Sequence, residues 1–319
     1  MRRHGVDADV LDHRDWSVAG TLRLARRLRD MDPDLVQMQY PMIVGWRSLG
    51  PHATGFLSKI PQVVTLHEFS SFDRLRRASL GAFAARASKL VLTTDFEAAR
   101  FLSRFPRARA KTSVIPIGSN VPFHPRTDRI STQRNIIYFG QIKPLKGLEQ
   151  FVELVELASA RQRPWTFQVV GAPVTWAGDY LAEMQRRLAG TRIEWLLDRS
   201  DDEAAELLAG ASAAYLPYPD GVSERRGSLI AALGNAVPVV TTHGEFEPAD
   251  IGETVLFAAD AAQAEARIDA LFDAPAHEAD VRRRSAAYVR KYSWDGIAQA
   301  YLAIYRDAAG VASRQGASR

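Results

Sequence analysis

Residues 218–242, YPDGVSERRGSLIAALGNAVPVVTT, pass from turn signals to helix signals and then to strand signals. The apolar run just before them, 213–218, ends among prolines and predicts a short buried strand. Apolar side chains then recur at helical spacing, at Leu229, Ile230 and Leu233. Pro238 ends that helix, and the β-branched run 239–242 predicts a second strand. The stretch therefore predicts the strand, loop, helix, strand order of an α/β fold.

The charged loop inside this stretch follows the carboxyl end of a predicted strand. Open parallel sheets place their ligands at that position. The helix that follows offers free N–H groups and a positive dipole, and Arg225, Arg226 and Gly227 suit the close approach of an anion. We therefore expect a phosphorylated ligand at this loop.

The composition limits the class of protein. A chain of 319 residues has room for two domains of ordinary size, and 46% hydrophobic with 24% charged residues is typical of a soluble globular protein. No apolar run reaches the ~18 residues of a membrane span, and no signal-peptide core opens the chain. The absence of cysteine excludes disulfides and cysteine chemistry and fits a cytoplasmic protein.

The charge is unevenly distributed along the chain. Residues 1–125 carry 19 Lys and Arg against 11 Asp and Glu, a net charge of +8, and residues 126–319 carry 22 against 26, a net charge of −4. Much of the excess lies on predicted helices, at Arg23, Arg26, Arg27, Arg29, Arg74, Arg76, Arg77 and Arg86. Anionic membrane headgroups or an anionic acceptor are candidate partners, and a solvated arginine-rich surface is the alternative. No basic groove interleaved with aromatic residues is present, so we expect no nucleic-acid partner.

Strand and helix signals alternate through the first half. Short apolar runs predict strands at 8–12, 35–40, 63–67, 89–94 and 113–117. Helical stretches at 18–31 and 72–88 separate several of them, which favours a parallel sheet covered by helices. Two Asp-x-Asp triplets, Asp7/Asp9 and Asp32/Asp34, could suggest a metal clamp. They lie at a strand start and at a helix-to-strand turn, and a catalytic cation needs several convergent oxygens, so we expect no metal.

His67 follows the carboxyl end of a predicted strand, which is a ligand-facing position in this architecture. A histidine that only satisfies a hydrogen bond at the strand end is an equally good interpretation.

The second half opens a new domain after a linker. Residues 125–134 have a polar, proline-containing linker composition. A buried-strand run then ends at Gly140, and the loop behind it carries Lys143 and Lys146 before a helix that reaches Ala160. This loop is a second candidate phosphate site. Further strands are expected at 166–171, 192–197 and 254–258, and an amphipathic helix at 294–305.

Several sequence features recur in one known family. In chain order they are Thr65-Leu66-His67-Glu68, Thr93-Thr94 with Phe96-Glu97, 115–120, Phe139-Gly140 with Lys146-Gly147, Val169-Val170-Gly171, 217–242 and Tyr292-Ser293-Trp294. In this order and spacing they resemble the GT-B glycosyltransferases, specifically the retaining, nucleotide-sugar-dependent family 4. The resemblance implies two Rossmann-like domains with parallel sheets that face a cleft, with the donor held mainly by the second domain.

The resemblance also implies the domain limits. It predicts an acceptor-side domain at 1–124, a linker at 125–134, a nucleotide-sugar domain at 135–291, a helix at 292–309 that crosses back to the first domain, and a tail at 310–319. Family members begin with a strand and a glycine-rich loop, whereas residues 1–7 here resemble the entry into the family's second strand. We therefore expect a first domain that is shortened at its N-terminus, either because the chain is a truncated form or because the domain is pared down. Exposed strand edges would be one consequence.

Individual residues take roles by the same resemblance. His67 and Glu224 match residues that contact the donor sugar and are the expected catalytic positions, and Lys146 matches the lysine that contacts the donor phosphates. The expected donor-binding residues are Gly140, Lys143, Lys146, Gly171, Ser223, Arg225, Arg226, Gly227, Ser228 and Leu229. Gln141 replaces an arginine of the family, so Lys143 or the pair Arg225/Arg226 would supply that charge. The family's second glutamate is replaced by Ala231 or Ala232, according to the direction of counting.

The resemblance implies a retaining glycosyltransferase that moves a sugar from a nucleoside-diphosphate sugar to a hydroxyl of a glycan, a lipid-linked acceptor or a small glycoside. We expect no obligatory metal or other cofactor, because cationic side chains can neutralise the leaving diphosphate. A cytoplasmic location is expected, with peripheral contact at the inner face of a membrane through the basic first domain. A non-catalytic nucleotide-sugar-binding protein of the same fold is the main alternative, and a sugar-nucleotide epimerase is a third interpretation.

Overall fold

The computed structural model describes residues 5–41, 48–128 and 133–310. The expected chain start at residues 1–4, the middle of the predicted linker and nearly all of the expected tail lie outside these ranges. The chain folds into two compact units: Met1–Ile117 with Trp294–Arg319 form unit 1, and Gly118–Ser293 forms unit 2. None of the described helices is long and apolar enough to cross a membrane.

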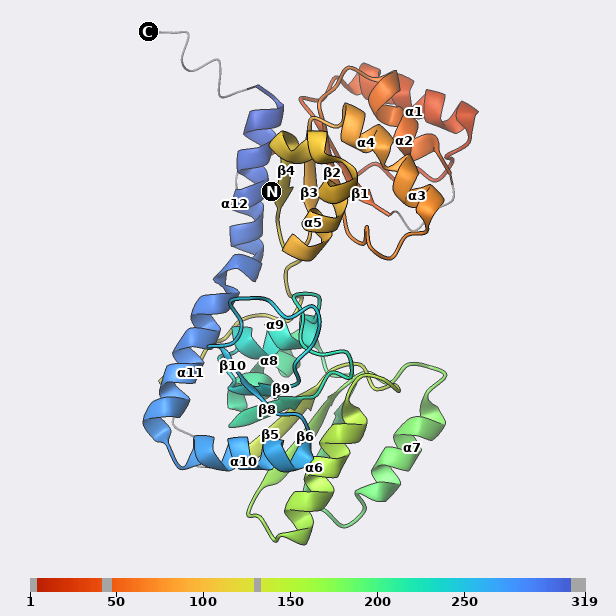
Figure 1. Ribbon diagram of the computed structural model, residues 1–319. Helices are drawn as coiled ribbons and strands as arrows, with labels where there is room; N and C mark the ends of the chain where they lie inside the picture. The colour runs from red at the N-terminus through yellow and green to blue at the C-terminus, as the bar shows by residue number, and fades with distance from the viewer. Residues whose placement is uncertain (1–4, 42–47, 129–132, 311–319) are drawn as a thin grey trace. The chain divides into compact units, whose positions relative to one another are not determined.

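Unit 1 contains a parallel sheet with the strand order β1-β2-β3-β4 in the described part of the chain (Figure 1). Its elements are α1 (Val18–Met31), β1 (Val36–Tyr40), α2 (Gly50–Leu57), β2 (Gln62–Leu66), α3 (Arg74–Ser79), α4 (Gly81–Arg86), β3 (Lys89–Leu92), α5 (Asp95–Arg104), the 3-10 helix η2 (Pro106–Lys111), β4 (Thr112–Val114) and α12 (Trp294–Ala308). The expected strands at 35–40, 63–67, 89–94 and 113–117 are present with small shifts of their ends.

The two faces of this sheet have different cores, because alternate strand residues point to opposite faces. Val64 and Leu66 face a core built with α1, α4 and α5, whereas Val63 packs against Ile297 and Tyr301 of α12. The hydroxyls of Thr65 and Tyr301 are hydrogen-bonded at 2.7 Å. The last helix of the chain therefore covers one face of the sheet in unit 1, as Figure 1 also shows.

Two expectations for unit 1 were wrong. Residues 8–12 form no strand, and Val10 is 95% exposed. The reason is local, because the two adjacent apolar residues of this segment lie among aspartates. They do not provide the further apolar positions that a buried strand needs. The helix expected over 72–88 is split into α3 and α4, with Leu80 between them as the cap of both.

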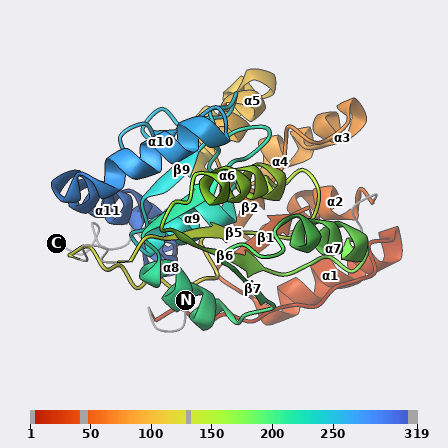
Figure 2. The ribbon, with the colours of Figure 1, turned by 90° about the horizontal axis from the view of Figure 1, so that it is seen from below.

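Unit 2 contains a six-stranded parallel sheet in the described residues, with the order β10-β9-β8-β5-β6-β7. Its elements are β5 (Asn135–Phe139), α6 (Leu148–Ala160), β6 (Thr166–Gly171), α7 (Gly178–Arg187), β7 (Ile193–Leu197), α8 (Asp201–Gly210), β8 (Ala213–Leu216), α9 (Gly227–Gly234), β9 (Val239–Thr241), β10 (Val255–Phe257), α10 (Ala261–Phe272), α11 (Pro275–Tyr288) and the 3-10 helix η3 (Val289–Tyr292). One apolar core joins the sheet to α6, α7 and α10, and the other joins it to α8 and α9 (Figure 2). The parallel α/β fold class expected from the sequence is confirmed in both units.

A buried arginine fixes the helices on the second face. Arg282 of α11 is fully buried and donates through Nε to Glu278 Oε1 at 2.9 Å. Its terminal nitrogens also donate to the carbonyl oxygens of Ala236 at 2.9 Å and Ala211 at 3.2 Å, just after the ends of α9 and α8. The guanidinium therefore satisfies carbonyl groups that a helix end leaves without partners.

We expect Arg282→Met to lower the free energy of unfolding by about 3–5 kcal/mol, because it removes a charged hydrogen-bond partner of the buried Glu278. Urea denaturation would measure the effect. The matched control is Arg283→Met on the same helix, where the side chain is 60% exposed and a change below about 0.5 kcal/mol is expected. Equal losses in the two variants would contradict this assignment.

Candidate functional site

The carboxyl ends of β5 and β8 lie side by side at the centre of the sheet in unit 2. Strands β6 and β7 continue the sheet beyond β5, and β9 and β10 continue it beyond β8, so the strand order reverses between β5 and β8. In open α/β sheets, ligands bind outside the carboxyl ends of the strands at such a switch point. The two charged loops identified from the sequence, 140–147 and 217–226, leave the sheet at these two strands.

Glycines bring these loops into backbone contact. Gly147 has a φ of 91°, and a Cβ atom there would lie 1.9 Å from the carbonyl oxygen of Pro217. A Cβ on Gly171 would lie 1.8 Å from the carbonyl oxygen of Gly140. The Tyr138 hydroxyl donates to the Lys146 carbonyl oxygen at 3.0 Å and so fixes the loop 140–147 to β5. The start of α6 is thereby fixed against the segment that follows β8.

Cationic side chains gather where the loops meet. Burial lowers the pKa of the half-buried Lys146, and the positive charges of Arg226 and Lys143 lower it further. Arg226 forms an ion pair with Asp220 and lies over the ring of Tyr218, with 4.6 Å between Cζ and the ring centre. Its Nε is buried without a hydrogen-bond acceptor in the described part of the chain. The cluster thus has positive charge in excess and a donor that an anion could satisfy.

Glu224 is held by the segment that precedes α12. The buried Tyr292 donates its hydroxyl to Glu224 Oε1 at 3.0 Å, and Lys291 Nζ lies 3.7 Å from the same oxygen. Burial raises the pKa of Tyr292, which keeps the phenol protonated as a donor. The carboxylate is therefore oriented by η3 while its own loop leads from β8 into α9.

The other expected donor-binding residues surround the start of α9. Ser228 shares a hydrogen bond of 2.8 Å with the Tyr218 hydroxyl, and Ser223 is buried in the loop. Leu229 is 1% exposed, so its side chain belongs to the core and only its backbone could meet a ligand. A Cβ on Gly227 would meet no atom within 4 Å, and Arg225 is exposed.

His67 lies in unit 1, directly after β2. Its backbone N–H donates to the Tyr40 carbonyl oxygen at 2.9 Å, and its Nε2 lies 2.7 Å from Gln39 Oε1. Burial lowers the pKa of the imidazole, which favours the neutral ring. If Gln39 Oε1 accepts, Nε2 carries the proton of that ring. The structure therefore gathers the expected residues of unit 2 at one sheet edge, and it places His67 at the end of β2 in unit 1.

Sequence reasoning missed the contact that fixes the loop behind His67. Ser70 donates its backbone N–H to Glu97 Oε2 at 2.8 Å and its hydroxyl to Glu97 Oε1 at 2.6 Å. Thr94 and Glu97 have the spacing of a helix start, and the Thr94 hydroxyl does accept the Glu97 N–H at 3.1 Å. That spacing could have located the start of α5, but the contact with Ser70 depends on the tertiary fold.

The family models that match the two halves of the chain both describe glycosyltransferases. Residues 2–121 match the family model described as Glycosyltransferase Family 4, and residues 133–274 match the model described as Glycosyl transferases group 1. A GDP-mannose:cellobiosyl-diphosphopolyprenol alpha-mannosyltransferase of Xanthomonas oryzae pv. oryzae is 24% identical over 257 residues. The match covers 78% of this chain and 65% of that relative's length.

Solved structures share the fold. A glycosyltransferase from Rickettsia africae aligns with a TM-score of 0.72 at 15% identity, over 95% of this chain and 84% of that one. Anabaena Alr3699/HepE, solved in complex with UDP and glucose, aligns with a TM-score of 0.64 at 17% identity, over 94% and 86% of the two chains. These structures support the GT-B architecture that the sequence predicted.

We expect Gly147→Ala to lower the free energy of unfolding by about 1–2 kcal/mol through its positive φ, and by a further ~1–3 kcal/mol through the contact with Pro217. Thermal or urea unfolding would measure both parts. Gly190→Ala is the matched control, because Gly190 has a φ of 82° but a Cβ atom there would meet no atom within 4 Å. Equal losses at the two glycines would show that the close approach contributes nothing.

We expect an NMR titration of His67 to give a pKa below its ordinary value of 6.5. Because the folded state binds this proton less readily than the unfolded state, the contribution of His67 to stability is complete above pH 6.5. It falls as the pH is lowered from 6.5 towards the folded-state pKa. A His67 pKa at or above 6.5 would contradict the burial argument.

Proposed function

The chain belongs to the family 4-like glycosyltransferases of the GT-B fold, and we propose that it transfers a sugar from a nucleoside-diphosphate sugar to an acceptor hydroxyl, with retention at the anomeric carbon. The observation that carries the proposal is the cation cluster of Lys143, Lys146 and Arg226 at the β5/β8 switch point.

The first task of such a site is to stabilise the departing diphosphate. Lys146, Lys143 and Arg226 place positive charge beside the first turns of α6 and α9, where backbone N–H groups lack helical partners. Charge of this kind acts most strongly when it is fixed in place before the reaction. The buried Nε of Arg226 would find its acceptor in a phosphate oxygen, in exchange for part of the ion pair with Asp220.

The second task is to orient the transferred sugar. Glu224, fixed by Tyr292, would accept hydrogen bonds from sugar hydroxyls, and the family resemblance gives neutral His67 a contact with the same sugar. Two correctly placed groups restrict the sugar to a reactive orientation. In a retaining reaction the leaving phosphate can accept the acceptor's proton, so no protein base is required. None of these roles calls for a metal or another cofactor.

The relatives support a glycan or lipid-linked acceptor. The Xanthomonas relative is named for a sugar acceptor carried on diphosphopolyprenol and for GDP-mannose as donor. The Anabaena structure contains UDP and glucose. The exposed arginines of α1, Arg26, Arg27 and Arg29, would favour a location at the cytoplasmic face of an anionic membrane.

One observation favours a second candidate function, that of a non-catalytic nucleotide-sugar-binding protein. Both candidate positions for the family's second glutamate, Ala231 and Ala232, are fully buried in α9. Helix α9 contains no Asp or Glu, so it provides no carboxylate to the donor. A binder would take up nucleotide sugar without donor-dependent labelling of any acceptor, whereas the transferase would label one.

We expect calorimetry with UDP, GDP and ADP to detect binding of one nucleoside diphosphate. Lys146→Ala should weaken that binding by about tenfold or more, because it removes a charged contact to phosphate. Glu224→Ala should leave diphosphate binding unchanged and weaken only the corresponding nucleotide sugar. Each variant thus serves as the control for the other. Absence of binding by a folded chain would reject a functional donor site, and equal effects of both variants on the diphosphate would reject the assigned roles.

A further inference from the structure

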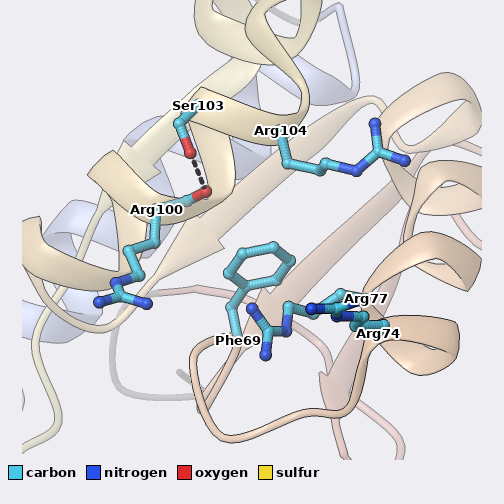
Figure 3. A pocket seen from close by; sticks show the side chains of 6 residues that line it. All are labelled: Phe69, Arg74, Arg77, Arg100, Ser103 and Arg104. Carbon is cyan, nitrogen blue, oxygen red and sulfur yellow. Dashed lines mark hydrogen bonds between the residues drawn. The ribbon is translucent and has the colours of Figure 1, made fainter.

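Unit 1 contains a cavity of about 480 Å³ that the donor site does not use. Helix α3 provides its lining on one side, α5 provides it on the other, and the loop behind β2 lies between them (Figure 3). The lining residues are Phe69, Arg74, Arg77, Arg100, Ser103 and Arg104. Arginines at i, i+3 spacing on α3 and i, i+4 spacing on α5 lie on one helical face each, so two short helices place four arginines around one cavity. Figure 3 shows the guanidinium groups of Arg100 and Arg104 pointing in different directions.

The four cavity arginines differ in their charge partners from other arginines of unit 1. Within the described residues none of them forms an ion pair, although Arg23 and Arg14 of the same unit pair with Asp15 and Asp12. Arg77 uses only its Nε, which donates to the carbonyl oxygen of Phe72 at 2.6 Å. The cavity therefore concentrates positive charge that the described part of the protein does not neutralise.

The nearby carboxylates are occupied elsewhere. Glu97 accepts two hydrogen bonds from Ser70, and Asp73 accepts the backbone N–H of Arg76 at the start of α3. Glu68 and Asp95 form no ion pair with the four arginines in the described ranges. An anion that enters the cavity therefore meets arginines that are not ion-paired with any carboxylate of the described residues.

The ring of Phe69 lies at the floor of the cavity, between the two helices (Figure 3). The Phe69 ring is only 2% exposed and packs edge-on against Phe101, with 5.4 Å between the ring centres. Arg100 and Arg104 lie over the rings of Phe96 and Phe105, at 5.0 Å and 5.6 Å from the ring centres. Stacking on aromatic rings limits the freedom of a guanidinium and so lowers the entropy lost when it binds a ligand.

The chemistry of the cavity fits a diphosphate ester. A guanidinium can bind phosphate through two parallel N–H groups, and four of them can contact both phosphates of a diphosphate. The apolar surface of the cavity suits the organic part of the ester. The loop that carries Phe69 begins at His67, so this cavity is continuous in sequence with the residue expected at the transferred sugar.

We propose that this arginine cavity binds the diphosphate group of the acceptor, and hence that the acceptor is a diphosphate ester. The proposal rests on the proposed transferase function, because the donor diphosphate has its own cations at Lys143, Lys146 and Arg226 in unit 2. The cavity thus gives unit 1 an anion site for the second substrate.

The test is calorimetry of the full chain with inorganic pyrophosphate, farnesyl diphosphate and inorganic phosphate at one ionic strength. Arg100→Gln/Arg104→Gln should weaken both diphosphate probes by about tenfold or more, since each variant site loses a charged hydrogen-bond donor. Arg107→Gln/Arg109→Gln is the matched control, because it removes the same charge from exposed residues of the same unit outside the cavity. Binding to the donor site is separated with Lys146→Ala, which should retain this diphosphate binding.

Three results would overturn the proposal. One is an equal loss in the cavity variant and the control, which would indicate general charge attraction. Another is a preference for inorganic phosphate over both diphosphates. The third is unchanged diphosphate binding in the cavity variant, with lost binding only to phosphatidylcholine vesicles that contain phosphatidylglycerol, which would indicate a membrane surface as the partner.

Two supporting results separate the sources of the diphosphate. Tighter binding of farnesyl diphosphate than of pyrophosphate supports a lipid-linked acceptor, and equal binding supports a soluble diphosphate ester. The cavity variant should also bind the nucleoside diphosphate of the donor as the unmodified chain does. Failure of the donor experiment with intact binding of the diphosphate probes would reject the transferase proposal and leave the anion site standing.

Discussion

The parallel pairing of β5 with β8 is the constraint on which the candidate donor site depends. Because β5 and β8 are far apart in the chain, their pairing brings together two loops that are distant in the sequence. The two strands begin the two halves of the sheet and pair directly with each other. Gly147 then allows the first loop to contact the backbone of the second, and Lys146 comes within electrostatic reach of Arg226. A single strand pairing thus determines which charges meet.

Much of the fold follows from local sequence, because buried parallel strands are short apolar runs with clear ends. The limits of α1 and β6 match the expected ranges, and the loops with Lys146 and Glu224 lie after strands as expected. The strand predicted at 8–12 is absent because an apolar pair among aspartates has too little apolar surface to bury. The single helix predicted over 72–88 is divided at Leu80, which caps both α3 and α4. The helical spacing of apolar residues does not mark this division.

The parts of the site that sequence could not predict are contacts between distant segments. Tyr292 belongs to a recurring motif of the sequence, but its hydrogen bond to Glu224 depends on the position of η3 against α9. The arginines of α3 and α5 were visible as basic residues, yet only the packing of the loop with Phe69 between the helices joins them in one cavity. The residue types determine which chemistry is possible. The strand order determines which of these residues lie close enough to act together.

The two units differ in how their segments follow one another along the chain. Unit 2 is one continuous stretch, whereas one sheet face of unit 1 is covered by α12, which follows unit 2 in the sequence. During synthesis a chain emerges from its N-terminal side, and domains generally fold as they become complete. Unit 2 can therefore finish folding while Val63 and Val91 of unit 1 still lack their apolar cover. Of the two units, the one whose translation starts earlier is the later to be completed.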